Sequence, residues 1–75
     1  MKFDSTILGN IIREERNQRG ISQEVLSGLA NIARTHLTMI ENGTKQPNLE
    51  TIWKLAGALE MKPSELIALV EKKTK

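Results

Sequence analysis

The stretch from Ser22 to Asn42 constrains the fold of this chain more than any other part of the sequence. It predicts two short helices, over about 23–29 and 34–42, that are joined by a tight turn. Ser22 is a good N-cap for the first of them, because its hydroxyl can accept from free backbone amides. Asn31 suits the turn, since asparagine tolerates left-handed backbone better than other non-glycine residues. We therefore expect a rigid pair of helices whose second member presents a polar face.

The apolar residues of this stretch recur at helical spacing and should hold the pair to the rest of the domain. The residues expected to face inward are Val25, Leu26, Leu29, Ile32, Leu37 and Ile40. Gly28 is a poor residue for a helix interior, by about 1 kcal/mol relative to alanine. Either a neighbouring backbone packs closely against Gly28, or the helix tolerates this loss of stability.

Three further helices are predicted around this pair, and no segment alternates like a β-strand. They run from Asp4 to Arg19, from a cap at Asn48 to about Glu60, and from Pro63 to about Glu71. The fourth-helix positions expected to face inward are Leu49, Ile52, Leu55, Ala56 and Leu59. The expected fold is all-α, with five short helices in a single domain over 1–75, a core over about 5–71 and a frayed tail at 72–75.

Composition excludes several classes of site. The chain of 75 residues has no cysteine and one histidine, so neither a disulfide, a thiolate metal site nor a zinc site is expected. It has one Phe, one Trp and no Tyr, which disfavours a stacking platform for single-stranded nucleic acid. No nucleophile–base pair or glycine-rich phosphate loop is present, so we expect neither an enzyme nor a cofactor.

Charge and hydropathy constrain partners and location less strongly. The net charge of +2 is too small to demand an anionic partner, although a local basic face remains compatible with it. No apolar run approaches the roughly 20 residues of a membrane span, and no signal-peptide pattern opens the chain. We expect a cytoplasmic, nucleoid-associated protein that does not bind a membrane.

Several short motifs resemble those of the Cro and phage-repressor (XRE-type) helix-turn-helix family. They are Ser-Gln-Glu-x-Leu at 22–26, Leu-Ala at 29–30, Ile-Ala-Arg-Thr at 32–35, Ile-Glu-Asn-Gly at 40–43 and Pro-x-Leu-Glu-Thr-Ile at 47–52. The resemblance extends from about Leu8 to Leu66. It implies a lambda-repressor-like domain that places the helix over 34–42 in the major groove of double-stranded DNA.

The resemblance also implies roles for individual residues. Those at positions that meet base edges are Arg34, Thr35, Thr38 and Met39. Gln23 takes a position that contacts phosphate and braces the first base-reading residue, and the positions that hold the DNA backbone are Asn42, Gly43 and Lys45. His36 either contacts DNA or is a solvated surface histidine. Arg16 and Glu41 take the places of a buried ion pair between the first and third helices.

The chemistry of these side chains agrees with the implied roles. The planar guanidinium of Arg34 can bind guanine O6 and N7 together. Thr35 and Thr38 each offer a hydroxyl and a methyl, which suit an adenine edge or a thymine methyl. Gln23 has an amide donor at a helix N-terminus, where the helix dipole also favours phosphate.

The resulting hypothesis is a sequence-specific transcriptional repressor that binds a palindromic operator as a homodimer. The alternative is an antitoxin-like or regulatory module whose main partner is another protein. The C-terminal helix favours that alternative, because its apolar residues exceed what one buried stripe needs: Leu66, Ile67, Leu69 and Val70. Trp53 is either a partly buried core residue or an anchor of a dimer interface, together with Ile67, Val70 or Met61.

Overall fold

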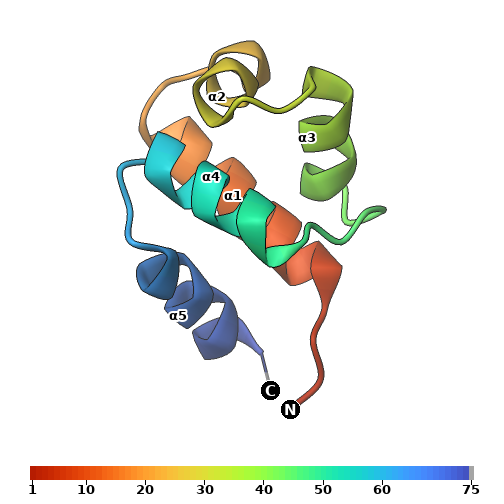
Figure 1. The fold of residues 1–75 in the computed structure, drawn as a ribbon. Helices are drawn as coiled ribbons and strands as arrows, with labels where there is room; N and C mark the ends of the chain where they lie inside the picture. Colours follow the sequence, from red (N-terminus) through yellow and green to blue (C-terminus); the bar gives the residue numbers. More distant parts are fainter. Residues whose placement is uncertain (75) are drawn as a thin grey trace.

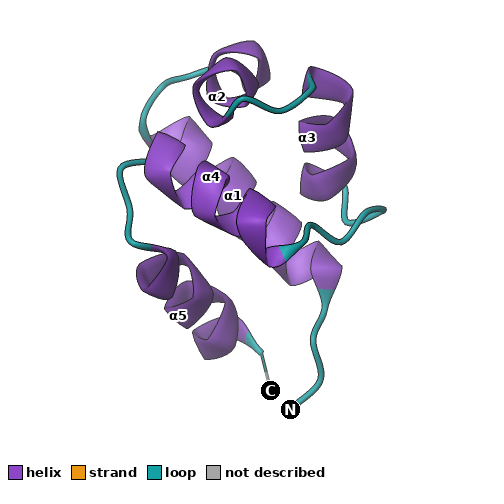
Figure 2. Ribbon diagram, in the orientation of Figure 1, coloured by secondary structure: helices purple, strands orange, loops and turns teal. Residues whose placement is uncertain are grey.

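The computed structural model describes residues 1–74, and within that range the chain forms five α-helices and no strand. The helices are α1 (Ser5–Gln18), α2 (Gln23–Ala30), α3 (Arg34–Glu41), α4 (Leu49–Ala58) and α5 (Pro63–Lys73). Figures 1 and 2 show α2 and α3 together at one end and α5 at the other, with α1 and α4 between them. The predicted all-α, five-helix fold is confirmed.

The predicted cap at Asn48 is present, and Asp4 caps the first helix. The Asp4 carboxylate accepts from the Thr6 amide at 2.9 Å, and the Asn48 side chain accepts from the Thr51 amide at 2.8 Å. Gly20 has a φ of +65° just past the end of α1, in the left-handed region that favours glycine. These local signals place the helix ends within one or two residues of prediction.

The C-terminal end differs from the prediction. Helix α5 continues to Lys73, two residues beyond the expected end near Glu71, so the first part of the supposed frayed tail is helical. Thr74 caps the helix, with its amide donating to the Val70 carbonyl at 3.1 Å. Lysines in the last turn of a helix also interact favourably with its dipole. The remainder of the expected tail, Lys75, lies outside the described residues.

One apolar core joins all five helices. Helix α1 packs against α3 and α5, α4 packs against α2 and α5, and α2 packs against α3. The buried apolar residues are Leu8, Ile11, Ile12, Leu26, Ala30, Leu37, Ile40, Ile52, Leu55, Ala56, Leu59, Leu66 and Val70. Most of the predicted inward positions are among them, and Ile32 is partly buried against the same core.

Three predicted core residues are instead exposed. Leu29 is 62% exposed and Leu49 is 65% exposed, and Val25 is also accessible. On α2, Leu26 and Ala30 face the core, whereas Val25 and Leu29 form the neighbouring i, i+4 stripe. Because both stripes of α2 carry apolar residues, the sequence alone does not show which stripe faces the core. A Cβ on Gly28 would meet nothing within 4 Å, so close packing does not explain that glycine.

Close packing does explain Gly9, in the middle of α1. A Cβ built on Gly9 would lie 2.6 Å from the carbonyl oxygen of Glu41 and would also collide with that of Ile40. The absence of a side chain at Gly9 therefore lets α1 approach the last turn of α3. Sequence reasoning gave Gly9 no role, although its position between Leu8 and Ile12 in an apolar stripe was visible.

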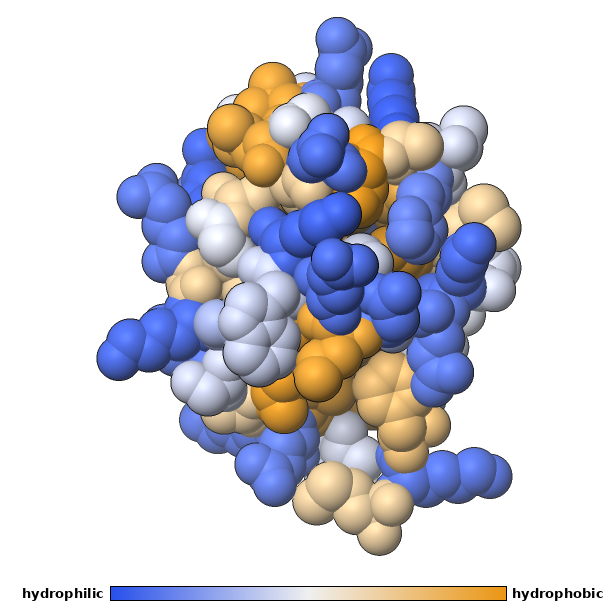
Figure 3. Space-filling view, in the orientation of Figure 1, coloured by the Kyte–Doolittle hydropathy of each residue, from blue (hydrophilic) through white to orange (hydrophobic). Residues whose placement is uncertain are grey.

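Of the two alternatives for Trp53, the structure does not support the partly buried core residue, because Trp53 is 57% exposed on α4. Most of the apolar cluster on α5 is used inside this domain: Leu66 and Val70 are buried, Leu69 is partly buried, and Ile67 is exposed. Figure 3 shows apolar surface over α2 and over the region between α4, α5 and the N-terminal segment. The apolar composition of α5 is therefore explained mainly by the core.

Candidate nucleic-acid interface

The turn between α2 and α3 adopts the geometry that the sequence predicts. The Ser22 hydroxyl caps α2 by accepting from the Val25 amide at 3.1 Å. Asn31 ends α2 with a φ of +56° and a ψ of +47°, which is left-handed backbone. Three residues later α3 begins at Arg34, so the two helices meet through a short turn of fixed conformation.

The outward face of α3 carries the residues to which we assigned base contacts. Successive residues of a helix are rotated by about 100°. Since Leu37, Ile40 and Glu41 are buried, the opposite direction passes close to Thr35 and Asn42. Met39 lies on one side of that line, and Thr38 and then Arg34 lie on the other. Arg34, Thr35 and Met39 are exposed and Thr38 is half-buried, so this face is accessible to a partner.

His36 is half-buried at the edge of this face, on the side away from Arg34. By helical rotation Arg34 lies at the opposite edge of the face, and of these two edge residues only Arg34 is exposed. Arg34 lies 4.0 Å from the Glu24 carboxylate across the helix pair, with both side chains largely exposed. An exposed pair of this kind contributes little to stability, so Arg34 can leave Glu24 for a stronger partner.

Glu41 is buried at the base of α3 and is paired as the resemblance implied. Its side chain is fully enclosed, and Arg16 of α1 donates to both carboxylate oxygens, from Nε at 2.8 Å and from Nη2 at 3.0 Å. The same guanidinium donates from Nη1 to the Ile21 carbonyl at 3.0 Å. Arg16 thus ties α1 both to the end of α3 and to the segment that leads into α2.

Opposing effects act on the pKa of Glu41. Burial raises it, but hydrogen bonds from Arg16 and Gln23 and the positive charges of Arg16 and Arg13 outweigh burial. The pKa of Glu41 is consequently held below its ordinary value, and the pKa of Arg16 is raised chiefly by its hydrogen bond to Glu41. The pair is charged in the folded protein.

Gln23 links this ion pair to the exposed face of α3. Its amide nitrogen donates to Glu41 Oε1 at 3.0 Å, and its amide oxygen accepts from the Thr38 hydroxyl at 2.9 Å. We expected Gln23 to brace Arg34, the first base-reading residue; in the structure its hydrogen-bond partner on that face is Thr38. One amide hydrogen of Gln23 is not used in these two bonds, and phosphate contact by Gln23 stays a prediction.

Arg13 is a positioning residue that sequence reasoning missed. Its Nη2 donates to the Glu41 carbonyl at 3.2 Å and to Asn42 Oδ1 at 3.3 Å, and its Nε lies 3.5 Å from Glu41 Oε1. It therefore holds the end of α3, where Asn42 is the C-cap. The available signal was the spacing of three residues between Arg13 and Arg16, which places both on one side of α1.

The loop after α3 is fixed against the start of α1. Gly43 has a φ of +77°, and a Cβ there would lie 2.9 Å from the Thr6 Cα. Ser5 donates to the Gly43 carbonyl at 2.9 Å. Lys45 is exposed, while its backbone amide donates to the Met39 carbonyl at 3.2 Å. The loop therefore presents the Lys45 side chain from a defined backbone.

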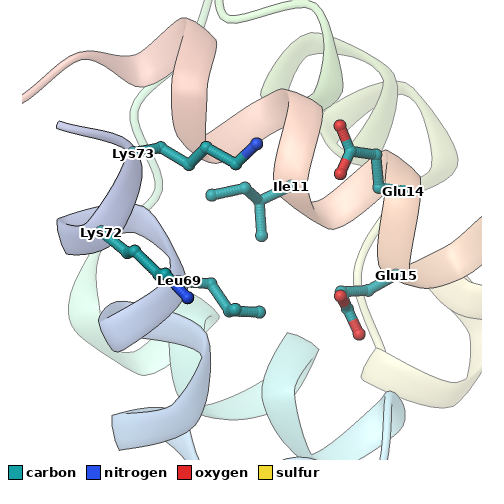
Figure 4. A pocket seen from close by; sticks show the side chains of 6 residues that line it. All are labelled: Ile11, Glu14, Glu15, Leu69, Lys72 and Lys73. Atoms are coloured by element: carbon teal, nitrogen blue, oxygen red, sulfur yellow. The ribbon is translucent and has the colours of Figure 1, made fainter.

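Residues 1–74 offer little support for other kinds of site. They contain no group of three acidic or histidine side chains that could hold a metal ion, and no helix long and apolar enough to cross a membrane. A cleft of about 380 Å³ lies between α1 and α5 (Figure 4). Glu14 and Glu15 line one wall and Lys72 and Lys73 the other, so the cleft has no single sign of charge that would select an ionic ligand.

The α2–turn–α3 unit, with its apolar back and polar outward face, defines a helix-turn-helix domain. Residues 12–66 match the helix-turn-helix family. Control protein C.BamHI of Bacillus amyloliquefaciens is 32% identical over 62 residues, which cover 81% of this chain and 76% of that protein. The uncharacterized transcriptional regulator YqaF of Bacillus subtilis is 40% identical over 38 residues, which cover 51% of this chain and only 50% of YqaF.

The chain is also similar to a solved structure, the restriction-modification controller protein C.AhdI from Aeromonas hydrophila. The two share 38% identity with a TM-score of 0.82, over 84% of this chain and 96% of C.AhdI. This chain belongs to the helix-turn-helix family of DNA-binding transcriptional regulators, as the sequence motifs predicted. The expectation that it is not an enzyme agrees with that membership.

Proposed function

We propose that this protein is a sequence-specific regulator of transcription that inserts α3 into the major groove of double-stranded DNA. The observation that carries the proposal is the outward face of α3. Arg34, Thr35 and Met39 are exposed there, while a buried ion pair at Glu41 holds the helix in place. Arg34 binds a guanine edge, and Thr35 and Thr38 meet neighbouring bases. Gln23, Asn42, Gly43 and Lys45 fix the protein on the DNA backbone.

We further propose that two copies bind one palindromic operator. The apolar surface that would join them consists of Phe3, Leu49, Trp53 and Ile67, all of which are exposed. Leu49 and Trp53 line one shallow hollow of the surface and Phe3 and Ile67 line another. Exposed large apolar side chains that cluster in this way mark interaction sites. A second copy is the partner that this surface fits best, because a single helix in the major groove reads only a half-site, and two-fold symmetry supplies the second one.

We propose that the protein represses transcription. We also propose that it acts in the cytoplasm, bound to DNA in the nucleoid. A dimer bound across an operator that overlaps a promoter excludes RNA polymerase from the same DNA. The similarity to the controller proteins C.BamHI and C.AhdI supports a role in gene control. In vitro transcription from a template that carries the selected operator in its promoter tests the sign of the effect, and a rise in transcript would contradict repression.

Selection from a random duplex library tests DNA recognition directly. We expect enriched duplexes with two inverted half-sites about one helical turn apart. Affinity for the selected duplex should fall with salt, with a log–log slope of about −0.9 for each phosphate neutralised. Enrichment of no duplex, or an affinity independent of salt, would contradict the proposal.

Sedimentation equilibrium tests the dimer. We expect wild-type protein to be dimeric and the double variant Trp53→Ala, Ile67→Asp to be monomeric with an unchanged far-ultraviolet circular dichroism spectrum. Leu29→Asp is the control, since it places the same charge on an exposed apolar residue of α2, outside the proposed interface. A wild-type monomer at all concentrations, also on operator DNA, would refute the dimer. Assembly only with a different protein would favour the interaction-module alternative.

A further inference from the structure

A chain of hydrogen bonds connects the buried ion pair to the DNA-facing surface of α3. Arg16 holds the Glu41 carboxylate, and Glu41 Oε1 accepts from the Gln23 amide nitrogen at 3.0 Å. The Gln23 amide oxygen accepts from the Thr38 hydroxyl at 2.9 Å, and the same hydroxyl lies 3.0 Å from the Arg34 carbonyl oxygen. Each step is a direct contact between named atoms, from α1 through α2 to the outer side of α3.

The direction of every bond in this chain follows from the chemistry of Glu41. An ionised carboxylate only accepts hydrogen bonds, so the NH₂ group of Gln23 must face it. The amide oxygen of Gln23 then faces Thr38. Neither an amide oxygen nor a backbone carbonyl can donate, so the single hydroxyl proton of Thr38 points into the protein toward one of these two oxygens. Toward an outside partner, the Thr38 hydroxyl oxygen can therefore only accept a hydrogen bond.

We propose that Glu41, acting through Gln23, fixes Thr38 as a hydrogen-bond acceptor, so that Thr38 selects a base with a major-groove amine and disfavours guanine. In the major groove the donors are the exocyclic amines of adenine and cytosine. Guanine presents only the acceptors O6 and N7, which would face the Thr38 oxygen without a proton between them. This inference rests on the proposed function and deepens it by assigning the base class that one position reads.

The competing arrangement has a clear structural cost. If the Thr38 hydroxyl turned outward to donate to a base, the half-buried Gln23 oxygen would lose its donor. Gln23 cannot compensate by turning over its amide, because its oxygen would then face the Glu41 carboxylate. The buried charge of Glu41 therefore prevents the network from reversing direction. Glu41 is in this respect a positioning residue for recognition as well as for the fold.

Atomic substitution in both partners tests the inference. Duplex selection with wild type and Thr38→Val first identifies the base pair whose preference depends on Thr38. At that pair, adenine is replaced by purine, or cytosine by 2-pyrimidinone, so that only the amine is lost. We expect wild type to bind the amine-deleted duplex about five- to tenfold more weakly, as for loss of one hydrogen bond. Thr38→Val should bind both duplexes equally.

Two further variants serve as controls. Thr38→Ser keeps the hydroxyl and should retain the dependence on the amine. Thr35→Val removes the hydroxyl of a neighbour outside the network; it should weaken binding to both duplexes alike and leave the ratio of their affinities unchanged. A wild-type preference for guanine at this pair that Thr38→Val abolishes would show that Thr38 donates and would overturn the inference. So would equal amine dependence in wild type and Thr38→Val.

The role of Glu41 needs a readout beyond stability. In Glu41→Gln a neutral amide replaces the carboxylate, so Gln23 can turn over and Thr38 can donate. We expect the discrimination against guanine to fall at this one base pair and to persist at the others, whereas a purely structural role would weaken binding to all sequences. Gln23→Ala, which removes the oxygen acceptor, should shift the same pair if Glu41→Gln does not fold. Selection of no duplex by wild type would instead overturn the proposed function itself.

Discussion

Arg16 and Glu41 form a doubly hydrogen-bonded ion pair that joins the last turn of α1 to the last residue of α3. Arg16 Nε and Nη2 lie 2.8 Å and 3.0 Å from the two oxygens of a carboxylate that is 1% exposed as a residue. Such a pair need not be more stable than an apolar replacement, but it makes each partner dependent on the other. The orientation of α3 is thus coupled to one buried charge.

Removing that charge should destabilise the fold, whereas removing an exposed charge nearby should not. We expect Glu41→Ala to lower the free energy of unfolding by about 3–5 kcal/mol, because Arg16 is left with an unpaired guanidinium at a largely buried site. Arg34→Ala should change it by less than about 0.5 kcal/mol, since Arg34 is exposed. Thermal and urea melts measure both, and equal melting temperatures would contradict this distinction.

Stability should also depend on pH through Glu41. Because the pKa of Glu41 is lower in the folded protein, the unfolded chain takes up this proton first as the pH falls. The stabilisation is present above the ordinary carboxyl pKa of about 4.3 and is lost as the pH falls through the lowered folded value. Urea melts from pH 7 to 3 on wild type and Glu41→Gln isolate this contribution, since the other carboxylates are common to both. If the free energies of unfolding of wild type and Glu41→Gln changed in parallel with pH, Glu41 would make no pH-dependent contribution to stability.

Two glycine-to-alanine substitutions should change the free energy of unfolding in opposite directions. Gly9→Ala places a methyl against the carbonyl groups of Ile40 and Glu41, so we expect a loss of about 1–3 kcal/mol. Gly28→Ala meets nothing within 4 Å and replaces a helix-interior glycine, so we expect a gain of about 0.5–1 kcal/mol. The difference in melting temperature between the two variants is the measurement. A neutral Gly9→Ala would mean that α1 and α3 do not require this close approach.

Lys45 and Arg34 should affect DNA binding in different ways. Lys45→Ala should weaken binding to all duplexes alike and reduce the salt slope by about one unit, as expected when one phosphate contact is lost. Arg34→Ala should relax the preference at one base pair, at a cost of about 1–3 kcal/mol. Titrations with selected and scrambled duplexes at several salt concentrations separate the two. Lys54→Ala, an exposed α4 lysine, is the control and should leave both quantities unchanged.

Local sequence signals predicted the helices well because their causes are local. The caps at Ser22 and Asn48 and the left-handed turn at Asn31 act within a few residues, and each was predicted and found. The inward faces of α2 and α4 were less certain. Val25, Leu29, Leu49 and Trp53 satisfy a helical period, but periodicity does not say which of two adjacent apolar stripes meets the core.

The sequence by itself determined the number of helices, the turn at Asn31 and the family, because caps, periodicity and motif spacing are properties of neighbouring residues. Only the tertiary structure decided how those helices contact one another. Residues far apart in sequence meet in three places: α1 approaches α3 over Gly9, Arg13 donates a hydrogen bond to Asn42, and a chain of hydrogen bonds runs through Gln23. Such contacts depend on how helices cross, and no local pattern encodes a crossing.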